Sequence, residues 1–290
     1  MTTRAVLRSA NGKLRAPWRL LIFAVVAVLL ALVAQTVVAL VGPGGGDAEI
    51  VSVGTIAFYW SLVLAFLAAH AVMLRFVDHQ PWSFVWMDGG AARPRLFGAG
   101  LLIGALAVGI PSALLIALGW LDITDAPGTW AADALAVAMF LLPAALVEEL
   151  MMRGYPLAVL RETLGAGWAL LITSVTFGVL HAANSNASVR ALVLVTVAGV
   201  FLGVIVLALR SLFAATAAHF AWNAVLAVAL HAAVSGEDLP GGDYRVIDGG
   251  PDWATGGAWG PEGGLGAVAG MLVAAAILAR RVRGTPTETS

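Results

Sequence analysis

The stretch ALVLVTVAGVFLGVIVLAL, residues 191–209, is a long uncharged segment between Arg190 and Arg210. An α-helix rises about 1.5 Å per residue, so about 20 apolar residues cross the roughly 30 Å hydrocarbon core of a bilayer. The stretch, extended to Arg190, therefore predicts a transmembrane helix.

Further hydrophobic runs lie on both sides of it, at residues 18–41, 51–77, 96–120, 132–152, 167–181, 212–234 and 265–282. The first run follows a basic segment but is longer than a signal-peptide core and lacks a small-residue cleavage site, so we interpret it as a retained anchor. These runs predict an all-α, polytopic membrane protein with about eight transmembrane helices.

The composition excludes several classes of protein. The chain is 60% hydrophobic and 11% charged, against about 45–50% and 25% in soluble domains. It has no Cys, which excludes disulfides, zinc fingers, iron–sulfur centres and thiol enzymes. Its net charge of -1 gives no reason to expect nucleic acid as a partner. We expect membrane lipid instead.

The basic residues predict the orientation, because they remain on the cytoplasmic side. Eight spans place both termini on one side. With that side cytoplasmic, Arg190 and Arg245 alone lie outside, and the inner segments hold Arg4, Arg8, Lys13, Arg15, Arg19, Arg75, Arg93, Arg95, Arg153, Arg161, Arg210, Arg280, Arg281 and Arg283. The near absence of Lys suggests a GC-rich bacterial genome, so we expect a multi-pass protein of the plasma (inner) membrane.

We divide the chain into five segments. They are a basic cytoplasmic N-terminus (1–17), three N-terminal transmembrane helices (18–130), a core carrying the candidate site (131–234), a Gly-rich extracytoplasmic loop (235–264), and a last transmembrane helix with a cytoplasmic tail (265–290). In the loop, Trp253 and Trp259 are interpreted as interfacial anchors of a flexible segment.

Polar residues inside the spans are the candidate functional groups, because an ionisable side chain in a bilayer is costly. Glu149 and Arg153 share a helical face and can form a buried ion pair. Glu148 points about 100° away, and a carboxylate without that partner suits a general base or acid. The other candidates are His181, His219 and Asn223. His70 belongs to no motif with other polar residues, so we expect it to be structural.

Two arrangements of the fourth helix remain open. If it continues to Leu164 and turns at residues 165–167, Glu148 and His181 each lie about 22 Å from the turn and meet at one depth. Alternatively, Gly154 and Pro156 break the helix after Arg153 and lay residues 157–164 along the membrane surface.

Three motifs carry a resemblance to a known family. Residues 148–153 read EELMMR and fit EExxxR, Phe177 and His181 fit FxxxH, and His219 and Asn223 fit HxxxN. In this order on successive membrane helices, they resemble the CAAX protease and bacteriocin-processing family, also called ABI or CPBP intramembrane proteases, which includes the type II CAAX prenyl endopeptidases. The resemblance spans about residues 132–230.

The resemblance implies a role for each matching residue. Glu148 would be the general base that activates water, assisted by His181, while His219 and Asn223 would polarise the carbonyl and stabilise the oxyanion. Glu149 and Arg153 would support Glu148, and Phe177 would shape the cavity. The implied function is an intramembrane endopeptidase acting on a hydrophobic or membrane-anchored peptide near the cytoplasmic half of the bilayer.

Alternatives stay open beside this hypothesis. A zinc site could use Glu148 or Glu149 with His181 and His219, but the chain lacks HExxH and Asn is a poor zinc ligand, so we favour no metal cofactor. A non-catalytic membrane scaffold or chaperone of the same fold is the second functional hypothesis. A proton-coupled transporter is the third.

Overall fold

The computed structural model describes residues 12–41, 50–126 and 128–283, together with Leu7. Its long helices are α2 (Ala16–Val41), α3 (Val53–Val72), α4 (Pro94–Ala117), α5 (Trp130–Arg153), α6 (Tyr155–Leu164), α7 (Ala166–Leu180), α8 (Val189–Leu209), α9 (Leu212–Ala224) and α11 (Leu265–Arg283). Short helical turns are η1 (Met73–Val77), η2 (Trp82–Val85), η3 (His181–Ala183), η4 (Val225–Ala229), α10 (Asp252–Thr255), η5 (Gly257–Trp259) and η6 (Pro261–Gly263).

Each hydrophobic run of the sequence forms a helix. In the described part of the chain, seven helical segments are long and apolar enough to cross a membrane. The eighth run forms α11, whose apolar part, Leu265–Arg280, is shorter. The predicted fold class is confirmed, and the chain is a multi-pass membrane protein.

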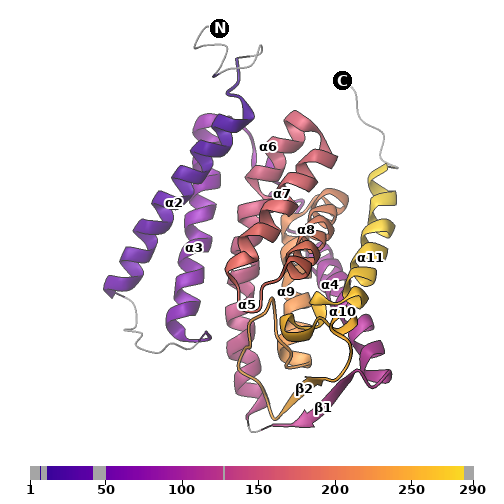
Figure 1. The fold of residues 1–290 in the computed structure, drawn as a ribbon. Coiled ribbons are helices and arrows are strands. Elements are labelled where there is room, and N and C mark those ends of the chain that lie inside the picture. The colour runs from indigo at the N-terminus through magenta and orange to yellow at the C-terminus, as the bar shows by residue number, and fades with distance from the viewer. Residues whose placement is uncertain (1–6, 8–11, 42–49, 127, 284–290) are drawn as a thin grey trace.

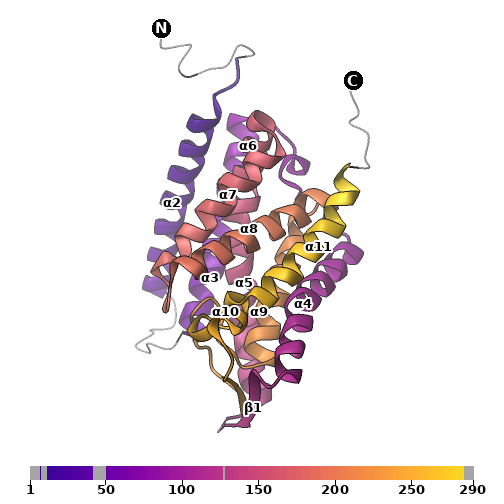
Figure 2. The ribbon, with the colours of Figure 1, turned by 45° about the vertical axis from the view of Figure 1, so that its right-hand side comes forward.

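The helical bundle has two distinct ends. The first turn of α2 and the last turn of α11 lie at the same end in both ribbon views (Figures 1 and 2). We call this the basic end, because Lys13 and Arg19 bind Glu162 there, and Arg161 stacks on Trp86 beside the start of α9. Arg4 and Arg8 lie outside the described residues. We call the opposite end the loop end; it holds the strands and residues 235–264.

Small residues bring α4 against α9, the helix that carries His219 and Asn223. A Cβ atom added to Gly100 would lie 2.1 Å from the carbonyl oxygen of Ala214, and one added to Gly104 would lie 2.0 Å from that of Ala218. Two glycines four residues apart thus face two alanines four residues apart, the close backbone approach that small residues permit between membrane helices.

The helix that carries Glu148 and Glu149, α5, ends at Arg153. The predicted alternative in which Gly154 and Pro156 break the helix after Arg153 is therefore correct about the break. Pro156 lies in the first turn of α6, which starts directly after Gly154. His70 explains why the break is stable: its Nε2 accepts a hydrogen bond from the backbone N–H of Tyr155 at 2.9 Å. A Cβ atom on Gly154 would lie 2.2 Å from that nitrogen, so this close approach requires glycine.

The basic end contains a buried ionic cluster that the sequence analysis did not foresee. Arg19 donates to Asp78 at 2.8 Å and to Glu162 at 2.6 Å, and the hydroxyl of Tyr155 donates to Asp78 at 2.5 Å. Because Arg19 is 2% exposed, its charge is compensated by two carboxylates rather than by water. The cluster joins α2 to α6 and to the residue that follows η1.

The loop end is ordered, which contradicts the interpretation of residues 235–264 as a flexible loop. Strand β1 (Leu121–Asp125) pairs antiparallel with β2 (Tyr244–Asp248), with Leu121 opposite Asp248 and Asp125 opposite Tyr244. Trp253 is exposed, but Trp259 is buried, so an interfacial anchor at Trp259 is wrong. The indole packs in a buried cluster with Met152, Phe177 and Val195, because η6, which follows Trp259, lies against both α8 and α11.

Replacing Gly104 by Ala is expected to lower the free energy of unfolding by about 1–3 kcal/mol, because the added Cβ overlaps the backbone of α9 and must push the two helices apart. Equilibrium unfolding in mixed micelles measures this.

The matched control is Gly98→Ala, on the same helix, where nothing lies within 4 Å of the added atom. It should stabilise the helix by up to about 1 kcal/mol. Equal effects of the two changes would contradict the proposed helix contact.

Candidate active site

The predicted site residues come from three elements that converge on one pocket. Glu148 lies near the end of α5, His181 begins η3 directly after α7, and His219 and Asn223 lie one turn apart on α9. All four side chains line a pocket of about 490 Å³. Their meeting, which the sequence left open, therefore occurs although α5 stops at Arg153.

Glu149 links the two principal helices of the site. One of its carboxylate oxygens, Oε1, lies 3.3 Å from Nη1 of Arg153, one turn along α5, and 3.0 Å from Nδ1 of His219 on α9. Glu149 and Arg153 are both fully buried. The guanidinium also lies over the ring of Phe177, 4.1 Å from its centroid, which adds a cation–π contact to the buried charge pair.

Glu148 occupies a different environment from its neighbour. Its side chain is 29% exposed, and Nε2 of His219 lies 3.7 Å from its Oε2. That separation is too long for a direct hydrogen bond, and both side chains line the same pocket. The rotation of about 100° between adjacent helical residues thus places one glutamate in the protein and the other at the pocket.

The hydrogen bond of His181 defines its tautomer. Nδ1 lies 2.8 Å from the carbonyl oxygen of Phe177, and because a carbonyl can only accept, Nδ1 carries the hydrogen. In the neutral ring Nε2 is then an acceptor. The Phe177 ring contacts His181 at a centroid distance of 4.6 Å and His219 at 6.2 Å, so Phe177 packs among the polar side chains.

The zinc alternative concerns Glu148 or Glu149 together with His181 and His219. Among the residues that the structure describes, no three His, Asp or Glu side chains lie close enough together to hold a metal ion. His219 instead directs its two ring nitrogens toward Glu149 and Glu148.

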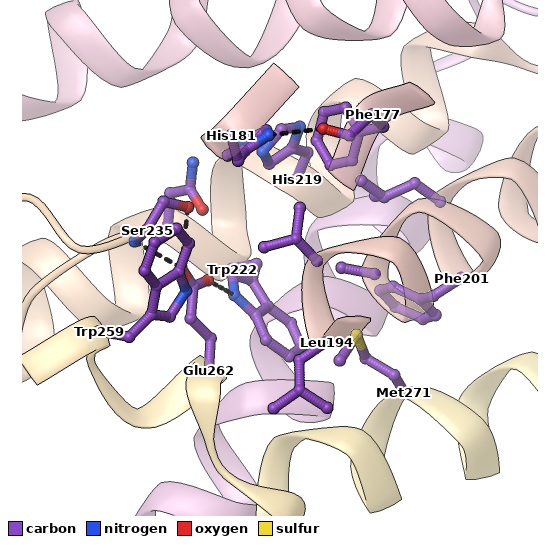
Figure 3. A pocket seen from close by; sticks show the side chains of 14 residues that line it. Phe177, His181, Leu194, Phe201, His219, Trp222, Ser235, Trp259, Glu262 and Met271 are labelled. Atoms are coloured by element: carbon purple, nitrogen blue, oxygen red, sulfur yellow. Dashed lines mark hydrogen bonds between the residues drawn. The ribbon is translucent and has the colours of Figure 1, made fainter. Parts of the chain in front are cut away.

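The structure adds wall residues that no motif contained. Tyr59 and Glu237 line the same pocket as Glu148. Trp222, Trp259 and Glu262 line a second, smaller pocket next to His181 and His219 (Figure 3). Nothing in the sequence marks Trp222 apart from its position next to Asn223. Trp259 and Glu262 belong to a Gly-rich segment that has no helical periodicity.

The comparison with protein families covers the part of the chain that holds these residues. Residues 130–225 match the Rce1-like family. This family is described as type II CAAX prenyl endopeptidase Rce1-like. The matched segment runs from the first residue of α5 to just after Asn223. The resemblance seen in the motifs is confirmed over this segment, and similarity to the Rce1-like family supports a membrane-embedded peptidase. No curated protein and no solved structure matches the chain.

Replacing Arg153 by Met should lower the free energy of unfolding by about 3–5 kcal/mol, because buried Glu149 loses the guanidinium partner on its own helix. The double variant Glu149→Leu with Arg153→Met should recover most of this loss, since it removes both members of the buried pair. Equilibrium unfolding of both variants in mixed micelles measures the two values.

Arg161→Met is the control, since it removes an exposed guanidinium from the neighbouring helix α6. It should change stability by no more than about 1 kcal/mol. A double variant as unstable as Arg153→Met would show that the ion pair is not the source of the loss.

Proposed function

We propose that this protein is an intramembrane endopeptidase in which Glu148 is the general base. The observation that carries the proposal is the convergence of Glu148, His181, His219 and Asn223 on one pocket. Peptide hydrolysis needs a base beside a water molecule and hydrogen-bond donors aimed at the developing oxyanion. These side chains supply both.

Glu148 and His181 hold the attacking water. The carboxylate of Glu148 accepts one of its hydrogens, and Nε2 of His181, an acceptor because Nδ1 donates to Phe177, accepts the other. Attack on the carbonyl carbon transfers a proton from water to Glu148. The protonated carboxyl then donates to the leaving nitrogen when the tetrahedral intermediate collapses.

His219 and Asn223 stabilise the oxyanion. With Nδ1 donating to Glu149, a doubly protonated His219 also donates through Nε2, and the amide of Asn223 supplies a second N–H from the same helical face. In this protonation state the net charge of the site is zero, because two carboxylates, Glu148 and Glu149, face two cations, Arg153 and His219. Glu149 is thus a positioning residue that orients the imidazole.

The substrate is a hydrophobic or membrane-anchored peptide. Besides the polar groups, the pocket is walled by Phe140, Leu141, Leu180 and Leu239, which favours apolar segments over charged ones. The pocket extends from Glu148, about 7 Å along α5 from its last residue, Arg153, to Ser235 and Glu237 of the loop end. The positive-inside distribution makes the basic end cytoplasmic. The bacterial origin that the near absence of Lys suggests makes the plasma membrane the proposed location.

Replacing Glu148 by Gln should lower cleavage by about 10²–10⁴-fold, because the amide cannot accept a proton. The measurement is a mass-spectrometric census of new peptide termini in membranes that contain wild type or variant at equal levels.

Asp133→Asn on the first turn of α5 is the control, since it also neutralises one carboxylate on that helix, and it should give the wild-type profile. Identical profiles for Glu148→Gln and wild type, with both proteins folded, would replace the protease with the membrane scaffold. If wild type carried out proton-coupled solute uptake and Glu148→Gln did not, the transporter would be favoured.

Chelation tests the zinc alternative. Dialysis of the purified protein against EDTA and 1,10-phenanthroline should leave cleavage of the same peptides unchanged, because the proposed steps use protein groups alone. Lasting loss of activity that Zn²⁺ restores would overturn the metal-free mechanism.

A further inference from the structure

The sheet at the loop end (Figure 1) has two strands in the part of the chain that the structure describes. Each strand is therefore paired along one edge and open along the other. At one end of the pair, the backbone N–H of Ala126 donates to the carbonyl of Asp243 at 2.8 Å. At the other end, the N–H of Gly249 donates to the carbonyl of Trp120 at 3.1 Å. These bonds fix which residues of β2 face β1.

Alternate residues of β2 point their backbone groups away from β1. In an antiparallel pair, residues that exchange hydrogen bonds with the partner strand alternate with residues that do not. Counting by twos from Asp243 leaves the N–H and C=O groups of Tyr244, Val246 and Asp248 on the other side. Among the described residues, none of these groups has a backbone partner. We call these three residues the open edge of β2.

The open edge of β2 lines a cleft of about 750 Å³, which we call the loop-end cleft. The other walls come from the residues that follow η4 and from the segment 255–261. Four of the wall residues are glycines, Gly241, Gly242, Gly257 and Gly260. Because glycine has no side chain, these positions leave room for a second backbone to approach.

Hydrogen bonds tie the start of β2 to the segment around the end of η4. The hydroxyl of Tyr244 donates to the carbonyl of Ala229 at 2.8 Å, and the N–H of Gly242 donates to Nδ1 of His231 at 3.1 Å. The rings of Tyr244 and His231 also meet edge to face, with 4.5 Å between their centroids. An edge that is already held in one conformation loses little entropy when a peptide pairs with it.

One loop segment separates the loop-end cleft from the proposed catalytic pocket. Ser235 and Glu237 line the pocket. Ala233 and Asp238 line the cleft, and Leu239 lines both. A chain bound in the cleft therefore lies next to the pocket in which a peptide bond would be cleaved.

An extended peptide is the occupant that fits an open strand edge inside a cleft. Main-chain hydrogen bonds to such an edge bind a peptide with little dependence on its side chains. Pairing with the sheet of a second copy would need an edge on the outer surface. The open edge of β2 instead faces walls formed by its own chain, so a single strand enters where a second sheet does not.

We propose that the open edge of β2 is a docking site at which an extended segment of the substrate peptide adds to the sheet as a third strand. The N–H and C=O groups of Val246 pair with the peptide backbone, and the bound chain leads past Leu239 to the catalytic pocket. This inference rests on the proposed function and deepens it. A substrate must present an extended segment of about 17 Å, the length of a five-residue strand, and the sequence of that segment can vary.

The first experiment measures peptide binding to the full chain in detergent micelles. Every protein in it carries Glu148→Gln, so that the peptide stays intact. The probe is a fluorescein-labelled peptide of about eight alternating Thr and Val residues, which favour extended structure, and fluorescence anisotropy follows its binding. Val246→Pro removes the N–H at the centre of the open edge. Ile123→Pro is the matched control, because Ile123 lies directly opposite Val246 and its N–H faces the outer edge of β1.

Val246→Pro should weaken binding by about tenfold, because proline has no N–H and its ring hinders a strand along that edge. Ile123→Pro should stay within about twofold of the parent protein. Ala258→Trp places a large side chain at an exposed position of the cleft wall and leaves the sheet unchanged, so it should weaken binding by a similar factor. The probe peptide methylated at every backbone nitrogen should also bind about tenfold more weakly.

Circular dichroism of each variant establishes folding. If Val246→Pro does not fold, Ala258→Trp and the methylated peptide test the same edge without changing β2. Equal losses in folded Val246→Pro and Ile123→Pro, or equal affinities for the two peptides, would overturn the docking site.

The second experiment measures cleavage with Glu148 intact, by mass spectrometry of new termini in a tryptic digest of total membrane protein. Val246→Pro should lower the yield of Glu148-dependent cuts by about tenfold relative to Ile123→Pro. If cuts depend on Glu148 but the two variants give equal yields, the docking site is wrong and the peptidase stands. If no cut depends on Glu148, the peptidase is wrong, and a peptide bound at β2 is not its substrate.

Discussion

The carboxylate of Glu149 joins Arg153 of its own helix to His219 of α9, and the rest of the site depends on this buried link. A charge without water must find its partners within the protein. Here the partners come from two helices, so α5 and α9 are fixed at one relative height. That height brings His219 to 3.7 Å from Glu148 and Asn223 to the same pocket.

Adjacent glutamates acquire different properties from this arrangement. Glu149 is buried, and its Oε1 contacts both Arg153 and His219, whereas Glu148 is partly exposed at the pocket. The division follows from helix geometry, since consecutive side chains diverge by about 100°. One carboxylate can then orient the imidazole while the other remains available to water, which is the separation of roles that the proposed hydrolysis requires.

The helices are held in place by contacts outside the matched family segment. Gly100 and Gly104 of α4 let that helix lie against the backbone of α9. His70 of α3 binds the N–H that the break after Gly154 exposes, and Arg19 of α2 ties α6 to Asp78. The N-terminal helices thus position the end of α5, and the folded loop end completes the wall beside α9.

The sequence by itself determined the hydrophobic spans and the pairing of Glu149 with Arg153, because length and four-residue spacing are local properties of a helix. The three motifs also located the residues that meet at the pocket. Only the tertiary structure decided the partners of His70 and Glu262, the burial of Trp259, and the pairing of β1 with β2. These contacts join segments far apart in the chain, and in the Gly-rich loop no periodicity records which face is buried, so their partners emerge only when the helices pack.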